Sequence, residues 1–235
     1  MTLVMLGLAI LAIGFGMLGS PAIVRAWESS ILQRIDQIKP APPGTIVFTG
    51  ASSVAYWDSL ATDMKPLRII NTAFGGAEYS DLNGDLERLV IAHRPAAVVV
   101  YAGDNDLAAP TRKTPQSVTN DVRRFVQGVH AKLPDTWVYV LSIKPSHARW
   151  GSWPQMKEAD RQIQEYLRTQ DRAEFIDVAT PMFDAHGDLP HDLFISDGLH
   201  PSAKCYAIWT SVIKPVLLKR FGPSANTSLS SATQQ

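Results

Sequence analysis

Three residues with the side chains needed for acyl transfer stand at two places that are far apart in the chain. Ser52 follows an apolar run that ends at Gly50, whereas Asp197 and His200 lie three residues apart just before Pro201. A serine hydroxyl is too weakly acidic to attack an ester unaided, so it requires a base within hydrogen-bond reach and a third group that orients the base. In a tight turn the Asp197 carboxylate reaches one ring nitrogen of His200 while the other faces the nucleophile. The residues predict Ser52 as nucleophile, His200 as base and Asp197 as the group that orients the base.

Acyl transfer also needs hydrogen-bond donors for the oxyanion of the tetrahedral intermediate, and these contribute roughly 3 kcal/mol each. The candidates are the backbone N–H of Ser52, the backbone N–H of Gly76 and the side-chain amide of Asn105. Gly76 suits this role because a residue without a side chain lets the backbone approach a substrate closely. The sequence therefore predicts an oxyanion hole made of Ser52, Gly76 and Asn105.

Each of these residues also has an ordinary structural interpretation. Ser53 follows the same apolar run and competes with Ser52 as nucleophile; the Gly-x-Ser spacing favours Ser52 and leaves Ser53 to cap the next helix. Gly76 and Asn105 taken singly are common turn residues. The aspartate–histidine pair would also suit a turn that leads into a helix.

Five short apolar runs rich in β-branched residues are expected to form strands. They alternate with longer stretches of helical period and cover residues 45–50, 68–73, 96–103, 137–143 and 173–179. Most are apolar on both faces, as parallel strands covered by helices must be. Between two of them Thr114 is placed as an N-cap and Pro115 in the first helical position. This alternation predicts a doubly wound α/β sandwich with a parallel sheet, in which ligands bind beyond the carboxyl ends of the strands.

Residues 183–200 contain three histidines and four aspartates, which raises the question of a metal site. His186 and Asp188 flank a glycine as in an ordinary turn, so no metal site is predicted there. Asp104 and Asp106 are interpreted as groups that brace their loop. Trp150 and Trp153 either line the substrate site or pack the long loop that contains them.

The bulk composition bounds the possible partners. Twenty-two basic residues balance twenty-two acidic ones, and no dense basic stripe is visible, so nucleic acid is not an expected partner. The single cysteine, Cys205, excludes an intrachain disulfide and a multi-cysteine metal site. At 235 residues the chain is expected to hold one catalytic domain, over residues 40–221, followed by a disordered tail at 222–235.

The N-terminal segment is different in kind. Residues 3–24 contain no charge, and at about 1.5 Å per residue such a helix spans roughly 30 Å, enough to cross a bilayer. We predict that residues 1–26 form a hydrophobic helix that serves as a single-pass membrane anchor. The alternative is a signal peptide cleaved near the small residues 20–22, which would leave a secreted or periplasmic enzyme. Arg25, Arg34 and Lys39 follow the segment and weakly favour a cytoplasmic domain.

The order of these motifs resembles the SGNH hydrolases, also called GDSL esterases and lipases. The resemblance rests on Gly-x-Ser at 50–52, a glycine after the second strand, Gly-x-Asn-Asp at 103–106 and Asp-x-x-His-Pro at 197–201. It spans about residues 45–218 and is nearest to the lysophospholipase-like or acetylhydrolase-like branch. The family often has aspartate or serine where this chain has Ala51, which leaves open how the serine loop is braced.

This resemblance implies a flavodoxin-like three-layer α/β/α sandwich with a five-stranded parallel sheet and ester hydrolysis without a metal or organic cofactor. It implies the same roles for Ser52, Gly76, Asn105, Asp197 and His200. We therefore predict a membrane-anchored serine esterase that acts on a lipid, an acylated sugar or a small acyl ester. The alternatives are an acyltransferase that uses the same site and a non-catalytic flavodoxin-like binding domain; acyl length, alcohol and oligomeric state are not predicted.

Overall fold

The computed structural model describes residues 42–108 and 113–223. All the described residues belong to one compact unit, Lys39–Gln235. The predicted N-terminal helix of residues 1–26 and nearly all of the predicted tail lie outside the described residues. Within the ranges that are described, no helix is both long and apolar enough to span a membrane.

The centre of the fold is a five-stranded sheet in which every pairing is parallel, as predicted. Its strand order is β2-β1-β3-β4-β5. The strands are β1 (Ile46–Gly50), β2 (Ile69–Asn71), β3 (Ala97–Tyr101), β4 (Trp137–Leu141) and β5 (Ala173–Ile176). All residues of β1 and β3 are buried, which explains why these two runs are apolar on both faces.

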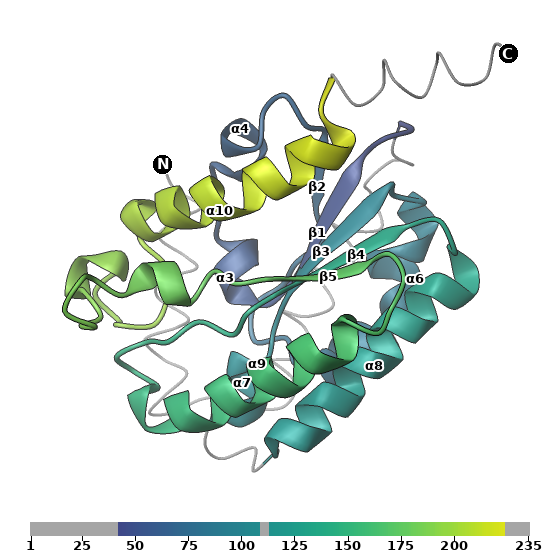
Figure 1. The fold of residues 1–235 in the computed structure, drawn as a ribbon. Coiled ribbons are helices and arrows are strands. Elements are labelled where there is room, and N and C mark those ends of the chain that lie inside the picture. The colour runs from purple at the N-terminus through teal and green to yellow at the C-terminus, as the bar shows by residue number, and fades with distance from the viewer. Residues whose placement is uncertain (1–41, 109–112, 224–235) are drawn as a thin grey trace, which may run out of the picture. The chain divides into compact units, whose positions relative to one another are not determined.

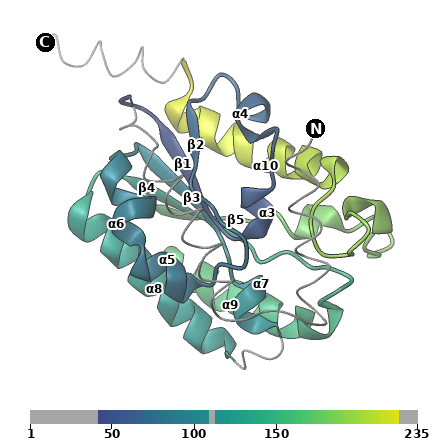
Figure 2. The same ribbon diagram turned by 180° about the vertical axis from the view of Figure 1, so that it is seen from behind.

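Helices cover both faces of the sheet and complete a three-layer sandwich (Figures 1 and 2). One face carries α10 (Ala203–Phe221) together with the short helices α3 (Ser52–Ala55) and α4 (Leu60–Asp63). The other face carries α5 (Tyr79–Gly84), α6 (Leu86–Leu89), α8 (Pro115–Lys132) and α9 (Trp153–Leu167). A further short helix, α7 (Asp104–Leu107), follows β3 directly. Among the residues that the structure describes, 3-10 turns lie at 91–93, 150–152, 180–182 and 191–193.

The local sequence accounts for these helices. Thr114 caps α8 because its hydroxyl accepts the N–H of Ser117 at 3.2 Å, and Pro115 takes the first helical position as predicted. The apolar stripe of α8 is buried against the sheet at Val118, Val122, Phe125, Val126 and Val129. On the opposite face α10 buries Cys205, Trp209, Ile213 and Leu217. The indole of Trp57 stacks on Tyr206 of α10 with ring centroids 4.8 Å apart, which ties the segment after α3 to this last helix.

Strand order also fixes where a site can form. In the order 2-1-3-4-5 the chain winds away from β1 in one direction and from β3 in the other, so the crevice at their carboxyl ends is the topological switch point. The segments that follow β1 and β3 begin with Ala51 and Ala102, and they lead into α3 and α7. The residues predicted for the nucleophile and for an oxyanion donor therefore lie on the two sides of this crevice.

Candidate active site

The end of β1 is built for a close approach to β3. Gly50 has a positive φ of 127°, and a Cβ at this position would lie 1.8 Å from the carbonyl oxygen of Tyr101. The N–H of Ala51 donates to that same carbonyl at 2.8 Å, and the N–H of Phe74 donates to the carbonyl of Gly50 at 2.9 Å. Backbone bonds to both neighbouring segments therefore brace the serine loop. Ala51 itself is fully buried, so its side chain makes no contact with water.

Ser52, His200 and Asp197 are brought together in one hydrogen-bonded chain. The Oγ of Ser52 lies 2.9 Å from Nε2 of His200, and Nδ1 of His200 lies 2.5 Å from Oδ2 of Asp197. The other carboxylate oxygen of Asp197, Oδ1, accepts the backbone N–H groups of Leu199 at 2.8 Å and His200 at 2.9 Å. The fold thus brings Ser52 and His200, which are 148 positions apart in the sequence, within the hydrogen-bond distance that catalysis requires.

The carboxylate is kept ionised in this turn. Partial burial of Asp197 opposes ionisation, but the bonds from the His200 ring and from the two backbone N–H groups outweigh it and lower the pKa of Asp197. His200 is only 4% exposed, and its ring packs against Tyr56 with centroids 5.1 Å apart. A charged Asp197 can therefore orient a nearly buried imidazole and stabilise a positive charge on it.

Ser53 does not compete for this contact. It is buried, and its carbonyl accepts the hydroxyl of Tyr206 at 3.0 Å. The prediction that Ser53 caps the next helix is wrong: α3 already begins at Ser52, its N-cap is Ala51, and no side chain caps it. The helix begins two residues earlier than a cap at Ser53 would require, because the chain turns at Gly50, directly before the N-cap Ala51.

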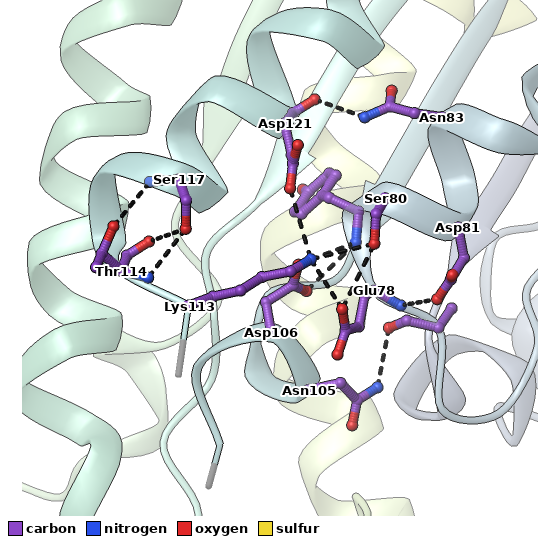
Figure 3. Close-up of polar contacts among 12 residues, drawn as sticks. Glu78, Ser80, Asp81, Asn83, Asn105, Asp106, Lys113, Thr114, Ser117 and Asp121 are labelled. Atoms are coloured by element: carbon purple, nitrogen blue, oxygen red, sulfur yellow. Dashed lines mark hydrogen bonds and ion pairs between the residues drawn. The ribbon is translucent and has the colours of Figure 1, made fainter. Parts of the chain in front are cut away.

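Asn105 and the loop of Gly76 lie together across the crevice. Gly76 is exposed with a φ of 77°, and no heavy atom would lie within 4 Å of a Cβ there. The side-chain Nδ2 of Asn105 donates to the carbonyl of Ala77, the next residue, at 2.9 Å (Figure 3). The two segments predicted to supply oxyanion donors are therefore joined directly to one another.

A partly buried charge cluster connects the same two segments. We call Glu78, Asp106, Lys113 and Asp121 the Lys113 cluster (Figure 3). The Nζ of Lys113 lies 2.8 Å from Glu78, 2.9 Å from Asp106 and 3.6 Å from Asp121. The carboxylate of Asp106 also accepts the backbone N–H of Tyr79 at 3.2 and 3.3 Å. This arrangement agrees with the interpretation of Asp106 as a brace and shows what it braces.

Burial shapes the charges in this cluster. Burial raises the pKa of Asp106 even though Lys113 donates to it. For Lys113 burial acts in the opposite direction, but its hydrogen bonds to Glu78 and Asp106 outweigh it and raise its pKa. Lys113 is therefore a cation shared by three neighbouring carboxylates, of which Asp121 also pairs with Arg124. Sequence reasoning missed it, because nothing in the local pattern around 113 indicates which carboxylates it meets.

A second charge cluster lies on the other side of Asn105. Asp104 is buried, and its Oδ2 lies 3.5 Å from Nζ of Lys144 and 3.2 Å from Nη1 of Arg149. Burial opposes ionisation of Asp104, yet the charges of Lys144 and Arg149 prevail and lower its pKa. Burial also lowers the pKa of the Lys144 amine, although Asp104 counteracts this. Both basic residues follow β4 in the "KPSHAR" loop, and that position was the only sequence signal for them.

The histidine- and aspartate-rich segment forms turns and surface contacts. Asp184 accepts the backbone N–H groups of His186 and Asp188, as predicted for a turn. The ring of His191 stacks on that of His147 with centroids 3.8 Å apart. Over the stretches that the structure describes, no group of three or more potential ligands is gathered closely enough to hold a metal ion.

Trp150, in the segment after β4, and Trp153, at the start of α9, both lie near Phe183. The ring centroids of Trp150 and Trp153 lie 6.4 and 5.9 Å from that of Phe183. Trp150 is 48% exposed, which is unusual for so large an apolar side chain. Packing of the loop accounts for the cluster, and the exposed ring of Trp150 remains available at the surface.

A serine bonded to a nearly buried histidine, which an ionised aspartate holds, is the arrangement of a serine hydrolase, and it lies here at the switch point of a flavodoxin-like sheet. The model of the GDSL-like Lipase/Acylhydrolase family matches residues 18–208. The chain belongs to this family, as the resemblance to the SGNH hydrolases predicted, and it is a hydrolase that acts on ester bonds.

Solved structures with this fold are distant in sequence. A protein of Streptococcus pneumoniae provisionally described as a platelet activating factor has a TM-score of 0.72 at 20% identity, with 84% of this chain and 98% of that chain covered. A GDSL-like lipase of Bacteroides thetaiotaomicron has a TM-score of 0.69 at 19% identity, with 81% and 97% covered. A family 3 carbohydrate esterase of Talaromyces cellulolyticus has a TM-score of 0.62 at 15% identity, with 75% and 98% covered. These likenesses establish the fold; no curated protein matches the sequence.

Proposed function

We propose that the protein is a serine esterase that hydrolyses carboxylic esters through an acyl-enzyme on Ser52. The hydrogen-bonded chain from Ser52 through His200 to Asp197 is the observation on which the proposal rests. It supplies a nucleophile, a base and an orienting carboxylate in the order that the chemistry requires.

In the first half-reaction Nε2 of His200 takes the proton from Ser52 as Oγ attacks the ester carbonyl. The negative charge passes to the carbonyl oxygen, which the N–H groups of Ser52, Gly76 and Asn105 bind. His200 is then an imidazolium, and Asp197 stabilises it. The imidazolium returns the proton to the alkoxide as the C–O bond breaks, so the alcohol leaves and the acyl group stays on Ser52.

In the second half-reaction water replaces the alcohol. His200 takes a proton from the water, the hydroxide attacks the acyl carbon, and the same donors hold the second oxyanion. When that intermediate collapses, Oγ regains its proton from His200 and the carboxylic acid is released. The site returns to its starting protonation without a cofactor taking part in any of these steps.

The decisive experiment replaces Ser52. We expect Ser52→Ala to reduce hydrolysis of p-nitrophenyl acetate to the uncatalysed rate and to abolish labelling by a fluorophosphonate probe, because the attacking oxygen is lost. Ser53→Ala is the matched control and should retain both activities. Normal turnover by a folded Ser52→Ala protein would refute the proposal.

Composition and the proposed chemistry bear on the location and the substrate class. We propose that residues 1–26 anchor the enzyme in a membrane, because residues 3–24 carry no charge. A lipid, an acylated sugar or a small acyl ester would all suit the proposed chemistry. Membrane fractionation of the full chain, before and after high-salt and detergent extraction, tests the anchor; a panel of esters of rising acyl length tests the substrate.

A further inference from the structure

Arg149 reaches across the site from the loop after β4 and binds the side chain of Asn105. Its Nη2 donates to Oδ1 of Asn105 at 2.8 Å, over a separation of 44 residues. Its other terminal nitrogen, Nη1, lies 3.2 Å from Oδ2 of Asp104, the residue before Asn105. One guanidinium thus holds two successive residues of the segment that carries the proposed oxyanion donor.

These contacts determine how the amide of Asn105 is turned. A guanidinium has no acceptor, so the Asn105 atom that faces Arg149 must be its oxygen. The carbonyl of Ala77 has no donor, so the Asn105 atom that faces it must be its nitrogen. The bond to Ala77 uses one N–H of Nδ2, and an oxyanion would use the second.

The same contacts place positive charge behind the amide. Lys144 is 0% exposed and Arg149 is half-buried, and both lie on the single carboxylate of Asp104. A cation that binds the amide oxygen draws electron density from the amide nitrogen and strengthens its N–H as a donor. Such a charge acts more strongly in a site that is shielded from water than it would at an exposed surface.

We infer that Arg149 is a positioning residue for the oxyanion hole: it fixes the rotation of the Asn105 amide and polarises it toward the developing negative charge. The inference rests on the function proposed above. Nη2 donates to Asn105, whereas Nη1 is a buried atom in ion-pair contact with Asp104 that makes no hydrogen bond among the described residues. Because Nη1 is shielded from solvent, this role is favoured over direct recognition of an anionic substrate. Arg149 is therefore expected to act through Asn105 and not through the substrate.

The test measures kcat and KM for p-nitrophenyl acetate in Arg149→Met, which keeps the apolar stem and removes the fork and the charge. We expect kcat to fall roughly tenfold to a hundredfold with little change in KM, a part of the 10²–10³ that a whole oxyanion donor supplies. Arg149→Lys keeps the charge but has no fork, so it should lie between. Arg161→Met is the matched control, because Arg161 pairs with Glu158 and Glu165 on the exposed side of α9, and it should keep the full kcat.

A double-mutant cycle with Asn105→Ala separates positioning from a general structural effect. If Arg149 acts through Asn105, Arg149→Met should lower kcat by less than about threefold once Asn105 is alanine. Equal losses in both backgrounds, or an unchanged kcat in a folded Arg149→Met protein, would overturn the inference. If Arg149→Met does not fold, Arg149→Lys enters the same cycle and is judged by the same criterion. A wild-type enzyme with neither turnover nor probe labelling would instead refute the proposed function.

Discussion

Replacing Asp197 by asparagine tests the role of Asp197 in orienting His200 more sharply than removal of the Asp197 side chain would. The reason is that the structure determines how the new amide must be turned. Oδ1 of Asp197 accepts two backbone N–H groups, from Leu199 and His200, while Oδ2 faces Nδ1 of the imidazole. An asparagine that keeps both backbone bonds must put its oxygen where Oδ1 is and its NH₂ group against the imidazole. Nδ1 of His200 then becomes an acceptor, so the ring proton moves to Nε2, where it faces Ser52.

The size of the effect follows from the same contacts. Turning the amide the other way would break two backbone hydrogen bonds at about 1 kcal/mol each. The catalytic tautomer of His200, with its proton on Nδ1 and a free Nε2, is therefore disfavoured by about 2 kcal/mol, or roughly 30-fold. The imidazolium formed during attack also loses its negative partner. Together these effects should lower kcat for p-nitrophenyl acetate roughly 10³- to 10⁴-fold, as in other serine relays.

Steady-state kinetics with p-nitrophenyl acetate checks this expectation, and urea unfolding verifies that the variant is folded. Asp192→Asn is the matched control, because Asp192 is an exposed carboxylate that pairs with Lys204 at 2.7 Å, and it should keep the wild-type kcat. A loss smaller than about 30-fold in a folded Asp197→Asn protein would refute the reasoning about the tautomer.

Two further predictions concern the elements that hold the site. Gly50→Ala should lower the free energy of unfolding by about 3 kcal/mol or more, because its Cβ would collide with the Tyr101 carbonyl at a φ of 127°. The control is Gly44→Ala, which has open space at a φ of 80° and should lower the free energy of unfolding by about 1 kcal/mol. Equal losses of stability for the two variants in urea unfolding would contradict this explanation. Lys113→Met should cost about 1–3 kcal/mol at pH 7 because it removes a cation that contacts the buried carboxylate of Asp106. Burial already raises the pKa of Asp106, so this carboxyl contributes to stability at low pH and loses that contribution as the pH rises through its folded-state pKa. The difference in free energy of unfolding between the wild type and Lys113→Met should therefore shrink as the pH falls from 7 to 4. A difference that stays constant with pH would exclude Asp106 as its cause.

The fold and the chemical groups of the site were predictable because each leaves a local mark in the sequence. Buried parallel strands are short and apolar on both faces, and the carboxyl ends of such strands meet at one edge of a sheet. This rule alone predicted that the motifs around Ser52, Gly76 and Asn105 lie at the same edge of the sheet. The position before the last helix was enough to predict the turn of Asp197 and His200. The contact of Ser52 with His200, and that of Asn105 with the loop of Gly76, are therefore consequences of topology.

The charge clusters could not be predicted in this way. Lys113 and Arg149 lie in irregular segments, where charged residues follow no period, and their partners lie on other loops. Arg149 and Asn105 are 44 residues apart, and only the path of the loop after β4 brings them into contact. The hydrogen bond from Ala51 to Tyr101 in the serine loop could not be predicted for a different reason: it is made by the backbone N–H, which every residue except proline has, so no residue type indicates it.

The loop after β4 also connects the two halves of the site. Arg149 binds Asn105 on the oxyanion side, while the N–H of the preceding residue, Ala148, donates to the carbonyl of Gly198 at 3.0 Å, within the turn of Asp197 and His200. Gly198 has a φ of 64°, so this turn depends on a conformation that side chains disfavour. A displacement of the loop would therefore disturb the donor amide and the proton relay at once. This coupling explains why a loop that supplies no reacting atom holds a buried lysine, a half-buried arginine and a backbone bond to the catalytic turn.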